Sequence, residues 1–520
     1  MIKMIILGLL LVAGLTASSA DKVSYLGNLP GTQSSGKEFH AGVYTYVHRM
    51  RALAVEQGKN YSDLMGEHLA KLASLGIDSV YLGGVSSENF DENLQLATRY
   101  HIKLVPQLDF VYFRENWDSN TLEATAKVAA AFINKYKGNP QILAWSVMEE
   151  PAPNIMDKLS VYYQKILELA PEAKFYLHCS ILAAMKNMDR PFPSVLSAGI
   201  YMFQWEVSGG GWWISPSAGL TLFRNQVRTF SAETFKKNTD FSLVITADAM
   251  AMPIMANRIS DPERVDGVPK DQKETYIAKC KKFAVDGRMG WGHFEKDGKT
   301  FYNVWKYYHP PTNCVKAMIW TGVMEGARSI FFWMYSPQTK ADSEMTLESS
   351  SYSGKAEVYH PMGRDSNQID PELKEYSETI KELSPYGKII VNMAKLPETP
   401  VKSETKNIFN NAFSCPGING RIAVLHNAEV GTWPANDQIF IDGRGNLKDY
   451  KPFTNAVIAL CEVALVQGEG VYDLANGEEI KETELDFKFV YPIKIMPGSG
   501  KFIFIGTRDQ FSRIYKQMQH

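Results

Sequence analysis

The sequence predicts an α/β fold, a (β/α)8 TIM barrel, followed by a small all-β sandwich. Short apolar runs that read as strands alternate with amphipathic runs that read as helices through the first two thirds of the chain. Strands that are apolar on both faces and alternate with helices are typical of a parallel sheet covered by helices. Eight such units, with no G-x-G-x-x-G after the first strand, favour a closed barrel over an open doubly wound sheet.

The expected elements follow the changing spacing of the apolar residues. Short continuous apolar runs indicate buried strands, and apolar residues three and four positions apart indicate helices. The expected strands cover residues 42–46, 77–82, 102–108, 142–148, 174–178, 195–203, 241–246 and 329–334. The expected helices cover residues 62–75, 92–100, 121–136, 155–169, 181–188, 221–237 and 313–325. The connection 252–311 is too long for a plain loop, and we expect it to form a lid or cleft wall.

The pattern changes beyond Pro337, where a polar stretch leads to a helix over residues 371–391. From about residue 400, short alternating strands are separated by Asn-Gly and Asp-Gly turns, which is typical of a β-sandwich. We therefore expect a signal peptide (1–20), a lead-in (21–37), a barrel (38–340) with the insertion 252–311, a linker and helix (341–399) and a sandwich (400–520).

The first twenty residues predict export. Lys3 precedes an apolar run over residues 4–15, and small residues at Ser18 and Ala20 fit cleavage after Ala20. The run is shorter than the roughly 18–20 apolar residues that span a bilayer, and no later stretch reaches that length. We expect a secreted or periplasmic protein without a membrane span.

Composition excludes several classes of function. The 55 Lys and Arg balance 57 Asp and Glu, so the chain lacks the positive field that nucleic-acid binding requires. The five cysteines are scattered without C-x-x-C, and we expect buried thiols. His48 has no His-x-His partner, and neither a P-loop nor a G-x-S-x-G motif is present. We expect no metal and no other cofactor.

The active site of a (β/α)8 barrel lies at the carboxyl ends of its strands. Carboxylates, amides and aromatic rings follow the expected strands there, in a chain with 10 Trp and 25 Tyr. Rings stack on the apolar face of a sugar, while carboxylates and amides bind its hydroxyls. The candidate substrate-binding residues are Tyr46, His48, Asp109, Glu149, His178, Tyr201, Trp205 and Trp333. We interpret His178 as a cleft or core histidine rather than a metal ligand.

The most specific motif is Ala144-Trp-Ser-Val-Met-Glu149-Glu150-Pro151. It resembles the fourth-strand motif of clan A glycoside hydrolases, the superfamily of β-galactosidases and β-glucanases, in which Asn-Glu-Pro ends the strand. The resemblance implies that Glu150 is the general acid and base, and that Glu149 replaces the Asn that binds the sugar 2-hydroxyl. Adjacent carboxylates also raise at least one pKa, which suits a proton donor. The alternative is a helix N-terminus that uses both acids as dipole partners.

The second carboxylate departs from the clan pattern. The resemblance implies a Glu nucleophile at the end of the seventh strand, where this chain has Asp248. Glu206, after the sixth strand, and Glu295, in the long insertion, are the alternative nucleophiles. The last strand resembles that of β-galactosidase-like barrels, which implies that Trp333 forms a sugar platform. Its alternative is a core position.

These observations predict an exported, cofactor-free glycoside hydrolase that cleaves a β-linked oligo- or polysaccharide, with Glu150 and Asp248 as the catalytic pair and a retaining mechanism. A carbohydrate-binding pseudoenzyme that has lost its nucleophile is the main alternative. An unrelated barrel, such as a lyase that uses Glu149 and Glu150 differently, is the third.

Overall fold

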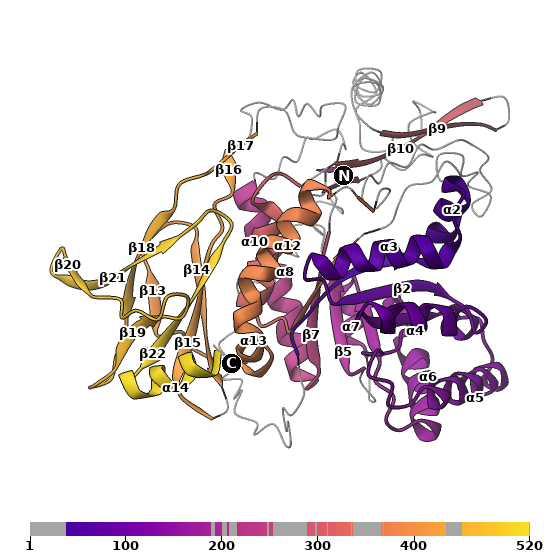
Figure 1. The fold of residues 1–520 in the computed structure, drawn as a ribbon, viewed down its shortest axis with the longest axis horizontal. Helices are drawn as coiled ribbons and strands as arrows, with labels where there is room; N and C mark the ends of the chain where they lie inside the picture. The colour runs from indigo at the N-terminus through magenta and orange to yellow at the C-terminus, as the bar shows by residue number, and fades with distance from the viewer. Residues whose placement is uncertain are drawn as a thin grey trace, which may run out of the picture.

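The chain forms a barrel and a β-sandwich that lie side by side, joined by helices (Figure 1). The computed structural model describes residues 38–188, 193–199, 205–206, 216–246, 249–252, 289–296, 299–308, 310–333, 335, 366–367, 369–415, 417–432 and 450–518. The predicted signal peptide, Tyr201 and Asp248 lie outside these residues.

The barrel is built on a parallel sheet of seven named strands in the order β3-β2-β1-β11-β7-β5-β4. The strands are β1 (His40–Tyr46), β2 (Ser79–Val85), β3 (Lys103–Leu108), β4 (Tyr176–Cys179), β5 (Val195–Gly199), β7 (Asp240–Thr246) and β11 (Ser329–Trp333). All neighbouring pairs are parallel, with registers such as Tyr44 beside Tyr81. This curled parallel sheet and the antiparallel sheets that follow it confirm the predicted fold class.

Residues 142–149 close the barrel between β3 and β4. Parallel bridges join Leu104 to Ile142 and Gln107 to Ser146 on one side, and Trp145 to Phe175 and Glu149 to His178 on the other. The prediction of a regular fourth strand over 142–148 is therefore wrong in detail, because only isolated bridges form. Pro106 contributes to this, since it accepts a bond from the Ser146 N–H at 3.0 Å but has no N–H to donate.

The closing segment also carries extra residues relative to both neighbours. Between its two bridges to β3 it advances by four residues while β3 advances by three, and the same difference recurs against β4. An additional residue of this kind is a β-bulge, which reverses the side-chain alternation that follows it. Ala144 lies in the barrel interior, whereas Trp145, Val147 and Met148 pack against the outer cluster. The alternation is thus broken immediately before Glu149.

Helices cover the outside of the barrel, as expected from their apolar faces. They are α2 (Val47–Gln57), α3 (Tyr61–Ser74), α4 (Phe90–Arg99), α5 (Ser119–Lys135), α6 (Met156–Leu169), α7 (Leu182–Lys186), α8 (Pro216–Lys236) and α10 (Cys314–Met324). Short 3-10 turns, η1 (Asp109–Val111) and η2 (Pro153–Ile155), follow β3 and precede α6. Asp118 caps α5 by accepting the Thr121 N–H at 2.7 Å.

An aromatic cluster fills the barrel interior. It takes inward side chains from neighbouring strands: Tyr44, Tyr81, Val105, Ala144, Tyr176, Val244 and Phe331. The rings of Tyr44 and Tyr81 stack with centroids 4.0 Å apart. The Tyr44 and Tyr176 hydroxyls lie 3.3 Å apart, and the Tyr81 hydroxyl lies 3.0 Å from Ser146 Oγ. The interior is therefore packed but hydrogen-bonded, and it forms a floor beneath the carboxyl ends of the strands.

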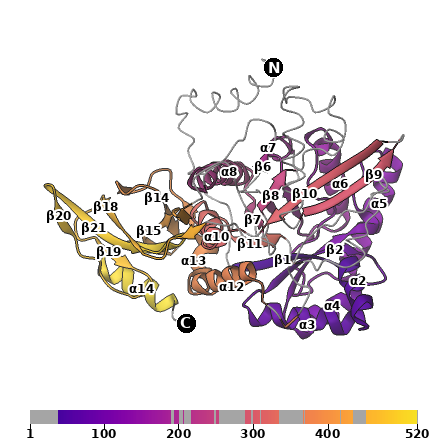
Figure 2. The same ribbon diagram turned by 90° about the horizontal axis from the view of Figure 1, so that it is seen from above.

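A second sheet grows from the carboxyl end of the barrel, in the order β6-β8-β10-β9. Its strands are β6 (Trp205–Glu206), β8 (Ala249–Met252), β9 (Met289–Lys296) and β10 (Lys299–Tyr308). β8 begins three residues after β7 ends, so this sheet starts at the mouth of the barrel. Both views place its strands over that end of the barrel (Figures 1 and 2).

The sandwich follows two helical elements, α12 (Pro371–Leu383) and α13 (Gly387–Asn392), which are separated by η6 (Ser384–Tyr386). Its sheets have the orders β12-β14-β15-β22-β19 and β13-β18-β21-β20, with a short β16-β17 ribbon beside them. The strands are β12 (Ala394–Lys395), β13 (Val401–Ser403), β14 (Ile408–Cys415), β15 (Ile418–Asn427), β16 (Gly431–Thr432), β17 (Lys451–Pro452), β18 (Val457–Val463), β19 (Gly470–Asp473), β20 (Thr483–Leu485), β21 (Lys488–Ile495) and β22 (Gly500–Gly506). Helix α14 (Arg508–Met518) packs against β15 and β22.

A buried ionic cluster joins the sandwich to the barrel. Glu325, directly after α10, is fully buried. Its carboxylate accepts hydrogen bonds from Arg224 Nε of α8 at 3.1 Å and from Lys395 Nζ of β12 at 2.5 Å. Ser231 Oγ donates to the Glu325 carbonyl oxygen at 2.6 Å. One carboxylate therefore holds two barrel helices and the first sandwich strand together.

Cys179, Cys314, Cys415 and Cys461 are buried thiols, as expected, and Cys280 lies outside the described residues. Within the part of the chain that the structure describes, no helix has the length and apolarity of a membrane crossing.

Replacing the buried carboxylate should destabilise the junction. We expect Glu325→Gln to lower the free energy of unfolding by about 3 kcal/mol, because two largely buried cations lose their counter-charge. Chemical denaturation checks this value. Glu378→Gln, which removes an exposed helix ion pair with Lys374, should cost less than about 0.5 kcal/mol. Equal effects of the two variants would contradict the proposed importance of the junction.

A strained hairpin on the sandwich predicts a substitution that stabilises the protein. Leu485 pairs with Lys488, so Asp486 and Phe487 form a two-residue turn with φ of 48° and 64°. Such turns favour glycine, and a bulky side chain at positive φ is strained. We expect Phe487→Gly to stabilise the chain by about 0.5–1 kcal/mol in urea denaturation. Phe487→Ala keeps the Cβ atom and should change stability little, whereas a destabilised glycine variant would show that the strain argument is wrong.

Candidate active site

The candidate site is the inward layer of side chains directly above the aromatic floor. On several strands it is the next inward position, two residues after the floor residue: Tyr46 follows Tyr44, His178 follows Tyr176, and Trp333 follows Phe331. Glu149 belongs to this layer because of the bulge that precedes it. The structure thus places predicted site residues at one end of the barrel, from the adjacent strands β1 and β11 on one side and from β4 and residues 142–149 on the other.

Glu149 lies against the tyrosine floor. Its backbone N–H donates to the Tyr112 hydroxyl at 2.9 Å. Burial is the main cause that raises the pKa of its carboxyl to about 8, and the negative charges of Glu150 and Asp109 raise it further. The charge of Glu149 in turn contributes to the raised pKa values of Tyr44 and Tyr81. Glu149 is therefore protonated at neutral pH, and it can both donate and accept a hydrogen bond.

Glu150 occupies a left-handed backbone conformation, with φ of 48°. A glutamate rarely adopts this conformation, and the residue before a proline is restricted further, so the surrounding contacts must enforce it. The Glu150 N–H donates to the His178 carbonyl oxygen at 2.9 Å. Its side chain is 49% exposed, and Oε1 lies 3.8 Å from His178 Nε2. Burial raises the pKa of the Glu150 carboxyl, while a hydrogen bond with Ser180 opposes the rise.

His178 packs between the acid pair and the barrel wall. Its side chain is buried, and Nδ1 lies 3.2 Å from Ser197 Oγ of β5. Burial lowers the pKa of His178 to about 4, so the ring is neutral at ordinary pH. A Cβ atom at Gly199 would come within 2.3 Å of the ring, so glycine is required there. The interpretations of His178 as a cleft or as a core histidine both stay open, because the ring is buried and still lies beside Glu150.

Two rings line the opposite side of the mouth. A side-chain hydrogen bond joins Tyr46 and Trp333, while burial and then the charge of Glu149 raise the pKa of Tyr46. Gly83 makes room for Tyr46, since a Cβ atom there would lie 2.4 Å from the ring. His48 is exposed, with its ring centroid 5.6 Å from that of Tyr46. Trp333 is partly buried, which leaves both the platform and the core interpretation open.

Asp109 provides a third carboxyl at the same end of the barrel. It begins η1 directly after β3 and is exposed. Desolvation raises the pKa of its carboxyl, and a hydrogen bond from the Gly84 backbone opposes this. The negative charge of Asp109 contributes to the raised pKa of Glu149. The described part of the site therefore contains one partly buried acid, Glu149, and two exposed acids, Glu150 and Asp109.

The remaining predicted residues are not tested by this geometry. Tyr201 and Asp248 lie outside the described residues. Trp205, Glu206 and Glu295 are placed by backbone only, in strands β6 and β9 of the sheet at the barrel mouth. Within the described segments, no group of three His, Cys, Asp or Glu side chains could hold a metal ion.

The sequence interpretation missed the polar tyrosine floor. Tyr44, Tyr81 and Tyr176 each stand on an inward position, and Tyr112 contacts the backbone of Glu149. Strand alternation could have indicated Tyr44 and Tyr176, because they stand two residues before Tyr46 and His178 and therefore face the same side of the sheet. The sequence holds no comparable signal for Tyr112, because it lies beyond η1 in a segment without periodic structure.

Comparisons with known proteins return loose structural likenesses only. No protein-family model matches the chain, and no curated protein matches it. A glycoside hydrolase family 5 mannosidase from Rhizomucor miehei is similar at 10% identity, over 67% of this chain and 94% of that chain, with a TM-score of 0.40. AmyP, solved with maltose, is similar at 8% identity, over 89% and 96%, with a TM-score of 0.44. The endoglucanase Cel5A from Pseudomonas stutzeri is similar at 10% identity, over 60% and 84%, with a TM-score of 0.34. These values are too low to assign a family, so the functional assignment depends on the site itself.

The raised pKa of Glu149 predicts a pH-dependent stability difference. Between its ordinary pKa of 4.5 and about 8, the unfolded chain releases a proton that the folded chain retains, so stability falls as pH rises through this window. Glu149→Gln removes this penalty. We expect its melting temperature, relative to that of the unaltered protein, to rise between pH 5 and pH 8. Glu67, whose pKa is lowered by a hydrogen bond from Lys59, is ionised in both the folded and the unfolded chain in this window, so Glu67→Gln should show no slope between pH 5 and pH 8 and the opposite slope only below its ordinary pKa of 4.5.

Proposed function

We propose that this chain is an exported glycoside hydrolase, active without a cofactor, that cleaves O-glycosidic bonds of a β-linked oligo- or polysaccharide. The observation that carries the proposal is the acid pair Glu149-Glu150 at the carboxyl end of a barrel, above a tyrosine floor and opposite Tyr46 and Trp333. Sugar hydrolysis needs a protonated acid within reach of the glycosidic oxygen and a second carboxylate. The N-terminal sequence supports export into a compartment where such substrates occur.

Glu150 is the residue that reaches the substrate. Its carboxyl is accessible, and its raised pKa increases the fraction that holds a proton at the start of the reaction. It protonates the departing oxygen and then removes a proton from water. The neutral His178 ring restricts its position without forming a competing strong ion pair.

Glu149 assists this chemistry by binding the substrate and by its electrostatic effect on Glu150. As a neutral acid it can hydrogen-bond a sugar hydroxyl, much as an amide would. If it ionised, its charge would lie beside Glu150 and raise the pKa of that residue further. The second catalytic carboxylate remains Asp248 in this proposal, with Glu206 and Glu295 as the alternatives. Asp109 is an additional carboxyl at the mouth, so it belongs in the same test.

Kinetics of Glu150→Gln test the proposal. Assay the protein with aryl β-glycosides and β-linked polysaccharides, and expect the variant to lose about 10²–10⁴-fold in kcat/KM. The loss should be smaller for a dinitrophenyl glycoside, because that leaving group departs without protonation. Glu88→Gln changes an exposed acid in the loop after β2 and should retain activity.

The same assay identifies the second carboxylate. Asp248→Asn should abolish turnover, whereas Glu206→Gln, Glu295→Gln and Asp109→Asn should retain it. Full activity in Asp248→Asn would overturn that assignment. Binding of oligosaccharide without turnover by the unaltered protein would instead support a carbohydrate-binding pseudoenzyme.

A further inference from the structure

A tyrosine hydroxyl continues the hydrogen bonding of the barrel beyond the end of β3. That strand ends at Leu108, and η1 then turns the chain. The chain comes back to the closing segment at Phe113, whose N–H donates to the Val147 carbonyl oxygen at 2.8 Å. The Tyr112 hydroxyl accepts the Glu149 N–H at 2.9 Å and donates to the Glu149 carbonyl oxygen at 3.3 Å. A side chain thus takes the place that a strand backbone would occupy beside Glu149.

The other edge of the closing segment is bound to β4. Glu149 is bridged to His178, whose carbonyl oxygen accepts the Glu150 N–H at 2.9 Å. Because successive residues of a strand direct their N–H and carbonyl groups to opposite edges, the groups of Glu149 itself point away from β4. They face the side of β3, where the Tyr112 hydroxyl binds both. Unpaired backbone groups in a half-buried site are costly, so these two bonds stabilise the arrangement.

Tyr112 is itself held by the residues on either side of it. The Val111 carbonyl oxygen accepts the hydroxyl of Tyr162, from α6, at 2.7 Å. Phe113 is buried, with its ring centroid 5.7 Å from that of Trp117. Burial is the main cause that raises the pKa of Tyr112 to about 12, so the hydroxyl keeps the proton that it donates at neutral pH.

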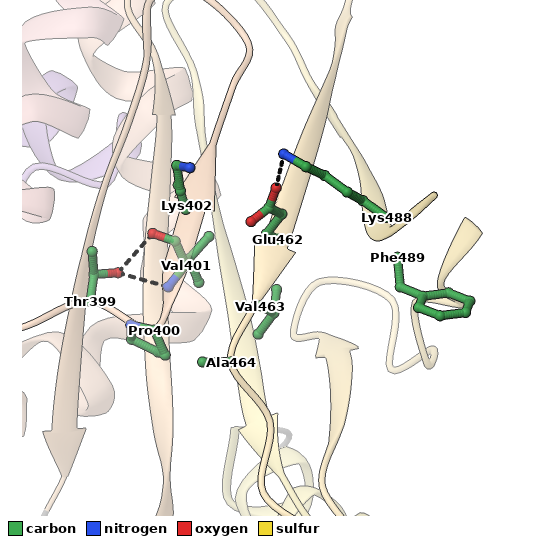
Figure 3. Close-up of a pocket in the computed structure, with 9 residues that line it drawn as sticks. All are labelled: Thr399, Pro400, Val401, Lys402, Glu462, Val463, Ala464, Lys488 and Phe489. Atoms are coloured by element: carbon green, nitrogen blue, oxygen red, sulfur yellow. Dashed lines mark hydrogen bonds and ion pairs between the residues drawn. The ribbon is translucent and has the colours of Figure 1, made fainter. Parts of the chain in front are cut away.

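A hydroxyl on the sandwich makes the same pair of contacts in a relaxed setting (Figure 3). Thr399 Oγ1 accepts the Val401 N–H at 3.2 Å and donates to the Val401 carbonyl oxygen at 3.5 Å. Val401 begins β13, an edge strand of its sheet. The residue that follows Glu149, in contrast, has a φ of 48°. Of the two hydroxyls, only that of Tyr112 therefore supports a strained backbone, which persists only where surrounding contacts enforce it.

We infer that Tyr112 is a positioning residue, whose hydroxyl holds the backbone of Glu149 and thereby fixes the directions of both acids of the pair. Its part in catalysis rests on the proposed function, because Tyr112 acts through Glu149 and Glu150. Without the hydroxyl, the strained turn keeps its bonds to β4 alone, and Glu150 relaxes out of the left-handed region. A displaced proton donor slows protonation of the leaving group more than it weakens substrate binding.

Kinetics of Tyr112→Phe test the inference, because this variant loses the hydroxyl and keeps the ring. For aryl β-glycosides whose leaving group needs protonation, we expect kcat to fall about tenfold or more and KM to change less than about twofold. The loss should be smaller for a dinitrophenyl glycoside. As a control, Tyr376→Phe removes a buried hydroxyl that lies 2.9 Å from the Gly42 carbonyl oxygen and 2.8 Å from that of Ile330, outside the site. Thr399→Val removes the sandwich hydroxyl, and both controls should retain kcat.

A second measurement needs no activity. Glu149→Gln is expected to raise the melting temperature, relative to its parent, between pH 5 and pH 8, and this rise should shrink by about half or more in a Tyr112→Phe parent. It should not shrink in a Tyr376→Phe parent. The titratable groups around Glu149 are Glu150, Asp109, His178, Tyr44, Tyr46, Tyr81, Tyr112 and Tyr176. Phenylalanine at position 112 leaves the charges of Glu150 and Asp109 in place, so a smaller rise reports a displaced Glu149.

Each outcome decides the inference. An unchanged rise in the Tyr112→Phe parent, or an unchanged kcat in an active chain, overturns it and leaves the hydroxyl a role in stability alone. Equal effects of Tyr376→Phe also overturn it, because general destabilisation would then explain them. So does the absence of any rise in the unaltered parent, because Glu149 would not occupy the place that Tyr112 is inferred to hold. If the unaltered chain hydrolyses none of the glycosides, the proposed function fails, and the melting temperatures alone decide the role of Tyr112.

Discussion

Closure of the barrel through residues 142–149 is the constraint on which the site depends. This segment must satisfy backbone hydrogen bonds to β3 and β4 at once, and it does so with extra residues relative to both. The resulting change of alternation turns Glu149 toward the tyrosine floor and forces Glu150 into a left-handed conformation. A local backbone irregularity therefore assigns two adjacent glutamates to two different environments.

The electrostatics of the mouth follow from that placement. The pKa of Glu149 is set by burial and by two neighbouring acids, and none of these causes is a cation. At the junction with the sandwich, by contrast, Arg224 and Lys395 neutralise the buried Glu325. Among the described residues, Glu325 is thus paired with cations at the junction, whereas no cation acts on the carboxyl of Glu149, where proton transfer is proposed.

Much of the architecture could be predicted because it depends on periodicity. The alternation of apolar strands and amphipathic helices predicted β1 to β3 and β11 within a few residues. The change of sequence pattern after Pro337, to short alternating strands separated by turns, predicted the sandwich. The bulge could not be predicted, since no residue in Ile142-Leu-Ala-Trp-Ser-Val-Met-Glu149 marks it. Strict alternation from Ala144 would have turned Glu150 inward. The neutral state of His178 also depends on contacts with β5 that are distant in sequence.

Gly199 limits which substitutions this site can tolerate during evolution. The His178 ring fills the space that any side chain at residue 199 would take, and Gly83 has the same relation to Tyr46. An alanine at either position would collide with that ring, so the ring must shift or give way to a smaller side chain before a methyl group fits. Sequence changes at the mouth should therefore occur in pairs. A homologue with a larger residue in place of Gly199 should also have a different residue in place of His178, and the same should hold for Gly83 and Tyr46.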